Sequence, residues 1–353
     1  MRDQKRALVL FMAAVCFLLL TACANAKSDK DVNAPEEEEK IQIGMSFDSF
    51  VIERWQRDRD AFVSTAKELG AEVNVQNANG DPEEQKKQID YFIEKGIDVL
   101  VIICIDSDGL KDSVAKAKEA GIKVIAYDRL IVDADVDLYI SFDNGRVGSL
   151  MAEAFIDNGL AGGCVLMIGG SPMDNNVKMV EGEFRRVMEE NNVTILDSVH
   201  ADGWLAEKGA EYVYDHMEII SRADAIMCGN DDIASRVVSA LAEKQLAGKI
   251  LVSGQDADLG ACQRIVEGTQ VMTVYKPIEK LAQRAAECAV ALARGETIEG
   301  DDVTMIDNGK YRIPYVGLEP VSVTEDNINE AIINSGFHLK EDVYLNVPGK
   351  MPK

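Results

Sequence analysis

Short apolar runs alternate with longer segments in which apolar residues recur every three or four positions, from Ile41 to about residue 294. In the first half of this region the runs are typical of strands, and they lie at residues 41–47, 73–76, 99–104, 124–127 and 138–142. The segments between them predict helices, and the first has Trp55 and Phe62 on one face before Gly70 ends it. Strands that alternate with helices of about 10–15 residues are typical of a parallel sheet covered on both faces.

The same alternation starts again after Asp143-Asn144. Apolar runs predict strands at residues 164–168, 194–199, 225–228, 250–253 and 271–274. Helical spacing predicts helices at residues 147–158, 177–190, 205–220, 233–244 and 259–267, and Pro277 opens a last long helix. One modest sheet does not hold so many strands. We therefore predict an α/β fold with two doubly wound parallel-sheet, Rossmann-like lobes.

The first 23 residues have the pattern of an export signal. Basic residues precede an apolar run over residues 7–20, which is followed by Thr21-Ala22-Cys23. This run is shorter than the roughly 20 residues that a membrane-spanning helix needs. Leu20-Thr21-Ala22-Cys23 is typical of a lipobox, and an ordinary signal followed by an accidental cysteine is the alternative. We expect residues 1–22 to be a lipoprotein signal peptide and Cys23 the lipid attachment site, so that the mature protein is anchored to the cell membrane on its extracytoplasmic side.

Composition narrows the partners further. Residues 23–40 are almost entirely polar and predict a flexible tether between the anchor and the fold. The chain has 37 basic and 61 acidic side chains, a formal net charge of −24. Such an acidic surface repels phosphate backbones, which argues against nucleic acid as a partner.

The cysteines and histidines show no metal or redox pattern. Five cysteines follow Cys23, widely spaced and mostly within apolar runs, at positions 104, 164, 228, 262 and 288. No C-x-x-C motif or Cys/His cluster occurs, so we predict neither a metal nor a cofactor. We interpret these cysteines as small buried apolar residues and leave one disulfide among them open.

Polar and aromatic side chains stand directly after the predicted strands of both halves. The most prominent are Arg54-Trp55, Asp128-Arg129, the loop at residues 169–178, Asp202-Gly203-Trp204, Asn230, Gln255-Asp256 and Lys276. A single Asp or Asn at such a place is most often a helix cap, but ligands in open α/β sheets bind at these strand ends. Carboxylates and amides accept from hydroxyls, guanidinium and ammonium groups donate to them, and indoles can cover apolar C–H faces. The set therefore favours a neutral polyol as the ligand.

Several stretches carry a specific resemblance. The motifs are DSFVIERWQRDRD at residues 48–60, AYDRLI at 126–131, YISFDN at 139–144, GGSPMDNN at 169–176, DGW at 202–204, SGQDADL at 253–259 and MTVYKP at 272–277. In order and spacing they resemble the D-xylose-binding proteins of bacterial ABC importers, from Ile41 to about His338. The stretch Ile103-Cys104-Ile105-Asp106-Ser107 is a departure, because related members tend to have a proline or an aromatic residue after this strand.

The resemblance implies two lobes, joined by three crossing strands, that close on a monosaccharide. It implies an extracytoplasmic, monomeric solute-binding protein that delivers a sugar, with D-xylose favoured, to the membrane permease of an ABC importer. The sugar contacts that it implies are Arg54, Trp55, Asp128, Arg129, Asn175, Asn176, Lys178, Trp204, Asn230, Asp256 and Lys276. Trp55 and Trp204 are expected to enclose the two faces of the sugar ring.

The chain is expected to cross between the lobes near Asp143-Asn144, near Tyr275-Lys276-Pro277 and after Asn308-Gly309. This assigns residues 41–143 and 277–308 to an N-terminal lobe and residues 144–276 and 309–340 to a C-terminal lobe. Residues 341–353 are polar and are expected to be a loosely attached tail.

Two other functions remain as alternatives. A protein of the same fold can be an extracellular sugar sensor that signals to a membrane histidine kinase, and the docking surface alone would distinguish it from an importer component. Asp128 and Asp256 could instead serve as the carboxylate pair of a glycosidase. No nucleophile elbow, phosphate-binding loop or metal-spaced histidine pair supports an enzyme, so we predict a binding protein.

Overall fold

A computed structural model describes residues 40–352, which belong to one compact unit. The predicted signal peptide, Cys23 and nearly all of the predicted tether lie outside the described residues. Between residues 40 and 352, no helix combines the length and the apolar character needed to cross a bilayer.

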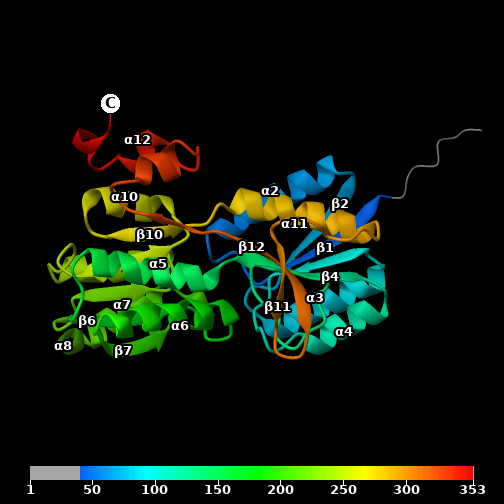
Figure 1. Ribbon diagram of the computed structural model, residues 1–353, viewed down its shortest axis with the longest axis horizontal. Helices are drawn as coiled ribbons and strands as arrows, with labels where there is room; N and C mark the ends of the chain where they lie inside the picture. Colours follow the sequence, from blue (N-terminus) through cyan, green and yellow to red (C-terminus); the bar gives the residue numbers. More distant parts are fainter. Residues whose placement is uncertain (1–39, 353) are drawn as a thin grey trace, which may run out of the picture. The chain divides into compact units, whose positions relative to one another are not determined.

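Within the described part of the chain, the strands form two sheets, each in its own lobe (Figure 1). The first sheet has the order β11-β12-β5-β4-β3-β1-β2. Its strands are β1 (Ile41–Phe47), β2 (Ala71–Asn77), β3 (Val99–Ile102), β4 (Lys123–Tyr127), β5 (Leu138–Phe142), β11 (Val303–Asp307) and β12 (Arg312–Leu318). All neighbours are parallel except β11 and β12, so the sheet is mixed rather than purely parallel.

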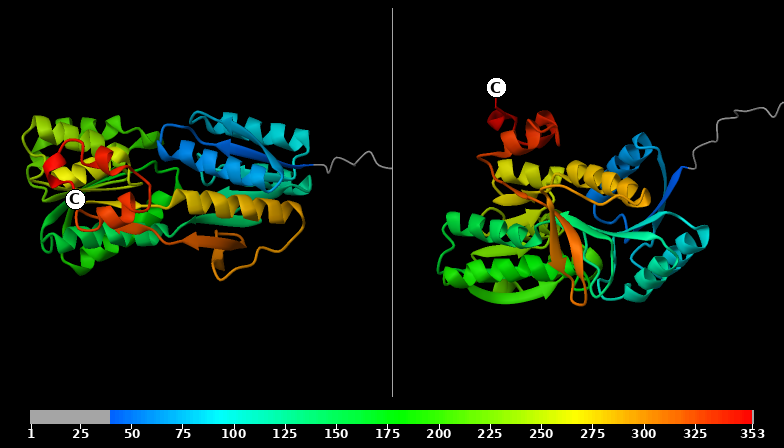
Figure 2. Two further views of the ribbon diagram at one scale, coloured as in Figure 1. Left: turned by 90° about the horizontal axis from the view of Figure 1, so that it is seen from above. Right: turned by 45° about the vertical axis from the view of Figure 1, so that its right-hand side comes forward.

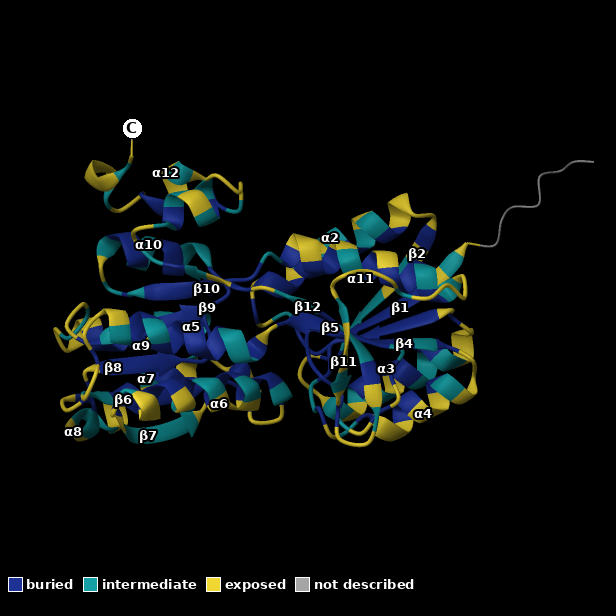
Figure 3. Ribbon diagram, viewed as in Figure 1, coloured by how far each residue is buried: buried dark blue, intermediate teal, exposed yellow. Residues whose placement is uncertain are grey.

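Helices cover both faces of the first sheet because its strands are apolar on both sides. Val99 and Val101 of β3 belong to the core beneath α2 (Arg54–Glu68) and α11 (Ile278–Ala293). Leu100 and Ile102 belong to the core beneath α3 (Pro82–Lys95) and α4 (Lys111–Glu119). The dark strands between partly exposed helices in Figure 3 show the same layering.

The second sheet has the order β13-β10-β9-β8-β6-β7. Its strands are β6 (Cys164–Gly169), β7 (Thr194–His200), β8 (Ala225–Cys228), β9 (Leu251–Gln255), β10 (Met272–Tyr275) and β13 (Val321–Val323). β13 is antiparallel to β10, and the remaining pairs are parallel. The order β7-β6-β8-β9-β10 repeats the order β2-β1-β3-β4-β5, so the two lobes have the same core topology, and the predicted doubly wound pair of lobes is confirmed.

The helices of the second lobe also lie on two faces. α5 (Asn144–Asp157) packs on α6 (Asn175–Glu190), and α7 (Glu207–Asp215) packs on α9 (Asp231–Glu243). Short elements complete the lobe, namely η1 (Asp202–Trp204), α8 (Met217–Ile220), α10 (Leu259–Glu267), η2 (Asn329–Ile333), α12 (Lys340–Val343) and η3 (Pro348–Lys350). The single helix predicted over residues 205–220 is interrupted at His216, which separates α7 from α8.

Three segments join the lobes, as the views in Figure 2 show. The first follows β5 at Asp143, and the second follows β10 at Lys276 and Pro277, near the predicted positions. The third was predicted after Asn308-Gly309, and this position is wrong. β12 pairs in parallel with β5 of the first sheet, and β13 pairs with β10 of the second, so the crossing follows Leu318. The prediction missed the hairpin of β11 and β12 because most of its residues are exposed or only partly buried, so it lacks a continuous apolar run.

The predicted loose tail is also wrong. The segment of residues 324–352, hereafter the C-terminal segment, packs on α10 of the second lobe (Figure 1). Val343 is fully buried there, and the Lys350 ammonium group donates to the Val266 carbonyl oxygen at 2.8 Å. Only a few apolar residues among polar ones make these contacts, so composition did not reveal them.

The five cysteines of the described range are all free thiols. Four are buried and Cys164 is partly buried, which agrees with their interpretation as small apolar residues and resolves the open disulfide question for this structure.

Candidate functional site

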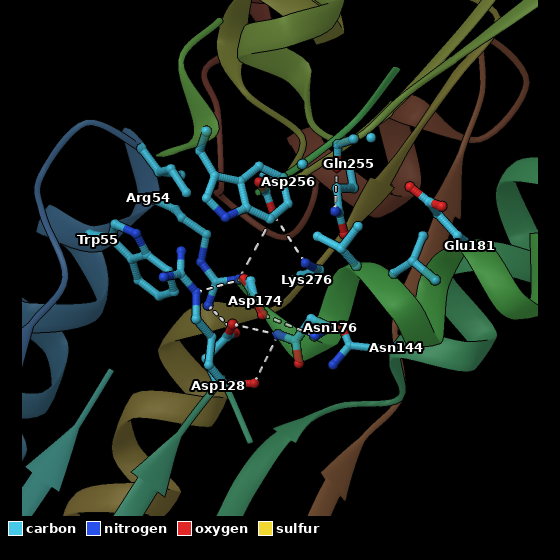
Figure 4. A pocket seen from close by; sticks show the side chains of 18 of the residues that line it. Arg54, Trp55, Asp128, Asn144, Asp174, Asn176, Glu181, Gln255, Asp256 and Lys276 are labelled. Carbon is cyan, nitrogen blue, oxygen red and sulfur yellow. Dashed lines mark hydrogen bonds and ion pairs between the residues drawn. The ribbon is translucent and has the colours of Figure 1, made fainter. Parts of the chain in front are cut away.

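A cavity lies between the two lobes, at the carboxyl ends of both sheets. About 480 Å³ there is not filled by protein atoms, including space that is open to solvent. Eight of the predicted contact residues line it, namely Arg54, Trp55, Asp128, Arg129, Asn176, Trp204, Asp256 and Lys276. Figure 4 shows Arg54 and Trp55 entering from one side and Gln255, Asp256 and Lys276 from another.

Arg54 is the first residue of α2, and it is held by carboxylates on three sides. Its guanidinium group donates to both carboxylate oxygens of Asp58 at 3.1 Å and to Asp128 Oδ2 at 2.9 Å. Asp256 of the second lobe lies 3.8 Å away. Asp58 is fully buried and also accepts from the Tyr127 hydroxyl group. Because these groups fix the guanidinium plane, Arg54 presents its remaining donors in one orientation.

Asp128 and Arg129 follow β4 directly and turn their side chains toward the cavity. Asp128 has the positive φ of +63°, which is unusual for a residue other than glycine. Its carbonyl oxygen accepts from Ser141 Oγ at 2.6 Å and from Asn176 Nδ2 at 3.0 Å, so local hydrogen bonds stabilise this backbone conformation. Asn176 belongs to α6, and its contact with Asp128 therefore joins the two lobes.

Arg129 neutralises two buried carboxylates. Its Nη1 atom lies 2.8 Å from Asp48 Oδ2 and donates to the Cys104 carbonyl oxygen at 2.9 Å. Its Nε atom lies 2.7 Å from Asp174 Oδ2, although the angle is not that of a hydrogen bond. Asp174 is the N-cap of α6 and accepts from the Asn176 backbone N–H at 2.9 Å. One guanidinium group thus connects β1, β4 and the first turn of a second-lobe helix.

The second lobe contributes a carboxylate and an ammonium group from neighbouring strands. Asp256 follows β9, Lys276 follows β10, and Lys276 Nζ lies 3.3 Å from Asp256 Oδ1. Asp256 and Ala257 have φ values of +98° and +57°, so the turn is strained. The Ala257 backbone N–H donates to Thr273 Oγ1 at 3.1 Å, and His338 contacts the Ala257 carbonyl oxygen at 2.8 Å.

Both tryptophans line the cavity. Trp55 is buried, with the Arg54 guanidinium carbon 4.5 Å from its ring centroid. Trp204 lies against the backbone of Gly170, where an added Cβ atom would come within 2.1 Å of its ring carbon Cη2. Among residues 40–352, Nε1 of both indoles, Nη2 of Arg129 and Oδ1 of Asp256 are buried without a hydrogen-bond partner. Such groups are costly to bury, so the cavity is built for a ligand with donors and acceptors.

The charges of the site shift its carboxylate pKa values in different directions. Burial alone would raise the pKa of Asp128, but the positive charges of Arg54, Lys276 and Arg129 outweigh it and the pKa is lowered. For Asp48 and Asp174, burial outweighs the attraction of Arg129, and both pKa values are raised. An ionised Asp128 accepts hydrogen bonds but has no proton to donate, which argues against the glycosidase acid role for this residue.

Three predicted contact residues do not line the cavity. Asn230 is buried, but its side chain accepts from the Ile233 backbone N–H at 3.0 Å and caps α9, which is the common role of an Asn after a strand. Lys178 is exposed on α6, and Asn175 is half-buried, with its backbone N–H donating to Ser107 Oγ at 2.9 Å. Their position in the motif did not reveal which face of the helix they occupy.

Other lining residues were not predicted as contacts. They include Ile52, Asn144, Asp174, Val177, Glu181, Met227 and Gln255. Gln255 is the last residue of β9, and Asp174 caps α6 in the loop that follows β6, so the same strand-end rule could have found them. Glu181 and Val177 lie within a helix, and only the three-dimensional structure brings them to the cavity.

Comparison with known proteins agrees with this geometry. Residues 43–297 match the family model described as periplasmic binding protein domain. The D-xylose-binding periplasmic protein of Haemophilus influenzae is 44% identical over 309 residues, which cover 86% of this chain and 92% of that protein. The protein of the same name from Escherichia coli is 42% identical over 331 residues, or 92% of this chain and 98% of that protein.

Solved structures lead to the same family. An ABC transporter solute binding protein from Clostridium phytofermentans, with bound β-D-glucose, has a TM-score of 0.76 and 28% sequence identity. The match covers 86% of this chain and 99% of that one. Because these similarities extend over most of its length, this chain belongs to the periplasmic binding protein family, in the type I group of ribose- and galactose-binding-like proteins.

Proposed function

We propose that this protein captures a monosaccharide, D-xylose in particular, by closure of its two lobes and delivers it to the permease of an ABC importer. The observation that carries the proposal is the cavity between the lobes. It is lined by buried charged groups from both lobes and by two indoles, and several of their donor and acceptor atoms have no hydrogen-bond partner. The relatives named as D-xylose-binding proteins support the choice of sugar.

The burial of the site supports a closing mechanism. Trp55, Asp128 and Arg129 are each at most 5% exposed. A sugar that contacts these side chains cannot reach them unless the lobes first move apart. Sugar bound to one lobe then offers partners to the other, so the closed arrangement gains stability only when the ligand satisfies both sides.

The chemistry of the cavity fits a neutral polyol. Asp128 and Asp256 can accept from hydroxyl groups, and Arg129 and Lys276 can donate to them, each such bond contributing about 1.5–3 kcal/mol because one partner is charged. A micromolar dissociation constant corresponds to about −8 kcal/mol. A few such bonds together with burial of the ring faces reach this value after the ordering costs of binding.

Isothermal titration calorimetry of residues 24–353 against a panel of sugars tests the proposal. We expect D-xylose to bind most tightly among D-xylose, D-ribose, L-arabinose, D-glucose and D-galactose. Another sugar binding best would contradict the choice of xylose but keep the function, whereas no binding by any of them would contradict the function itself. A variant with Asp256→Asn serves as the site control, since it keeps the shape of the side chain and removes its charge.

We also propose that Cys23 carries acyl chains after removal of residues 1–22, which would anchor the protein at the outer face of the cell membrane. The sequence Leu20-Thr21-Ala22-Cys23 is the support for this step. Fractionation of cells that express the full chain should find the protein with the membranes and the Cys23→Ser variant in the soluble fraction. Equal membrane association of both forms would contradict acylation at this cysteine.

A further inference from the structure

We propose that a contact outside the cavity, between Arg57 and Phe337, is a closure clasp that sets the affinity for every sugar by a common factor. The inference rests on the proposed function, because it concerns how the sugar-bound arrangement is stabilised. Arg57 belongs to α2 of the first lobe, and Phe337 belongs to the C-terminal segment on the second lobe. Neither residue lines the sugar cavity.

The two side chains make a direct contact across the lobes. The guanidinium carbon of Arg57 lies 4.6 Å from the centroid of the Phe337 ring, within the range of a cation–π interaction. Arg57 Nη1 also donates to the Phe337 carbonyl oxygen at 3.4 Å, a long hydrogen bond. Both residues are half-buried, so solvent weakens the contact only in part.

Phe337 is a firm partner because the C-terminal segment is fixed to the second lobe. Its ring packs on Tyr275, the last residue of β10, with centroids 4.8 Å apart. The neighbouring His338 contacts the Ala257 carbonyl oxygen, and Gln263 of α10 donates to the Asp342 carbonyl oxygen at 2.9 Å. Phe337 is therefore held next to the strand end that carries Lys276.

The clasp lies beside the sugar site without sharing its ligand contacts. A smaller cavity is lined by residues of both, namely Arg54 and Asp256 of the sugar site and Arg57 and Phe337 of the clasp, together with His338 and others. Arg54 and Arg57 lie three residues apart on α2. Arg54 lines the sugar cavity, and Arg57 forms the clasp. Phe337 and its neighbours meet the same helix from the second lobe.

The clasp should change the dissociation constants of all sugars in the same way. The contact exists only while the lobes are together, and it involves no sugar atom. It therefore shifts the equilibrium between open and closed forms by the same amount whichever sugar is bound. Loss of a cation–π contact between two half-buried side chains should weaken sugar affinity about 3- to 30-fold.

Calorimetry of the Arg57→Ala variant with at least two sugars that bind the unmodified protein tests the inference. We expect the dissociation constants to rise by one common factor of about 3- to 30-fold, with faster sugar release in stopped-flow tryptophan fluorescence. Arg59→Ala is the matched control, because Arg59 lies on the same helix but contacts Phe50 and Asp60 of its own lobe. The control should change neither affinity nor release.

Phe337→Leu removes the aromatic face while keeping apolar bulk against Tyr275, and it should weaken binding by a similar factor. The double variant with Arg57→Ala should then be little weaker than either single variant, since the same contact is lost in each. Unchanged dissociation constants in Arg57→Ala, or a change for one sugar and not another, would overturn the clasp. Failure of the unmodified protein to bind any sugar would instead overturn the proposed function.

Discussion

At the residue scale, Asp256 and Arg129 lie in the same cavity but have different surroundings. Asp256 Oδ1 accepts no hydrogen bond and has the buried cation of Lys276 3.3 Å away, whereas Arg129 lies beside the two buried carboxylates of Asp48 and Asp174. Asp256→Asn should weaken sugar binding about 100-fold, because hydrogen bonds to a charged group contribute about 1.5–3 kcal/mol each. It should lower the free energy of unfolding by about 1–3 kcal/mol, because Lys276 keeps a polar neighbour but loses its counter-charge. Calorimetry and urea unfolding measure the two effects.

Arg129→Met should weaken binding as well, but it should also lower the free energy of unfolding by about 3–5 kcal/mol, because two buried carboxylates lose their cation. Equal unfolding energies for the two variants would contradict the role of Arg129 in neutralising Asp48 and Asp174. The comparison therefore separates a residue that mainly serves the ligand from one that serves ligand and fold together.

Gly170 supports the Trp204 ring, and the absence of its side chain is what allows the ring to lie there. A Cβ atom at this position would come within 2.1 Å of the ring, so Gly170→Ala must displace the indole. Overpacking of this kind costs about 1–3 kcal/mol, and we expect affinity to fall at least about tenfold in calorimetry. Gly182→Ala in α6 is the control, since no atom lies within 4 Å of its added Cβ, and it should leave affinity unchanged.

Asp231 is a buried acid that supports the turn carrying Asp256. It accepts from Thr273 Oγ1 at 2.7 Å and from the Asp258 backbone N–H at 3.1 Å. Burial raises the pKa of Asp231 to about 7, from an ordinary value of 3.8. The folded protein therefore keeps a proton on Asp231 that the unfolded chain releases above pH 3.8. The contribution of Asp231 to the free energy of unfolding falls as the pH rises toward 7 and then levels off.

Asp231→Asn removes this titration. The melting temperature of the variant, relative to that of the unmodified protein, should rise between about pH 5 and pH 8, when both are measured by scanning calorimetry in the same buffers. A difference that stays constant over this range would show that Asp231 titrates with an ordinary pKa. The sign of the expected change distinguishes this acid from Asp128, whose pKa is lowered.

At the element scale, the C-terminal segment is part of the fold of the second lobe. Val343 of α12 is fully buried in a core shared with Cys262 and Ile265 of α10. Val343→Ala should lower the free energy of unfolding by about 2 kcal/mol, because it removes buried methyl groups and leaves a cavity. Leu345→Ala, at a side chain that is 65% exposed, should change it by less than about 0.5 kcal/mol. Urea unfolding of both variants checks the difference.

The same segment shows why part of the fold escaped prediction. Helix and strand periods located nearly every element up to residue 294, since each element there has a continuous apolar face. The hairpin of β11 and β12 buries only Ile313 and Val316, and the docked α12 has only four residues. Their places are fixed by pairing with β5 and packing on α10, which are contacts distant in sequence.

The prediction of the site had a similar limit, because the local sequence does not show which side chains meet in the fold. The strand-end rule and the resemblance found residues that line the cavity from strand ends, such as Asp128, Asp256 and Lys276. They did not separate a ligand group from a helix cap at Asn230, because both roles favour the same residue type at the same place. Glu181 has no local signal, since only the packing of α6 turns it toward the cavity.

At the scale of the whole molecule, the question is what holds the two lobes together when no sugar is present. Several contacts join them directly, including Asn176 with Asp128, Arg129 with Asp174 and Arg57 with Phe337. Against these stand the buried groups of the cavity that have no hydrogen-bond partner, among them Arg129 Nη2 and both indole N–H groups, which would regain water if the lobes parted. The second set favours opening, and a sugar reverses this preference by pairing those groups.

Solution scattering with and without sugar therefore measures the balance between the open and the closed arrangement of the lobes. We expect the radius of gyration to decrease when a binding sugar is added, because pairing of the buried groups removes the gain from opening. The Asp256→Asn variant at the same sugar concentration should stay at the larger value, since a principal acceptor is lost. Arg57→Ala should reach the smaller value only at higher sugar concentration, because it weakens the clasp and leaves the sugar contacts in place. An unchanged radius with a sugar that calorimetry shows to bind would mean that the lobes are already closed, and that the ligand enters by a local movement of the rim.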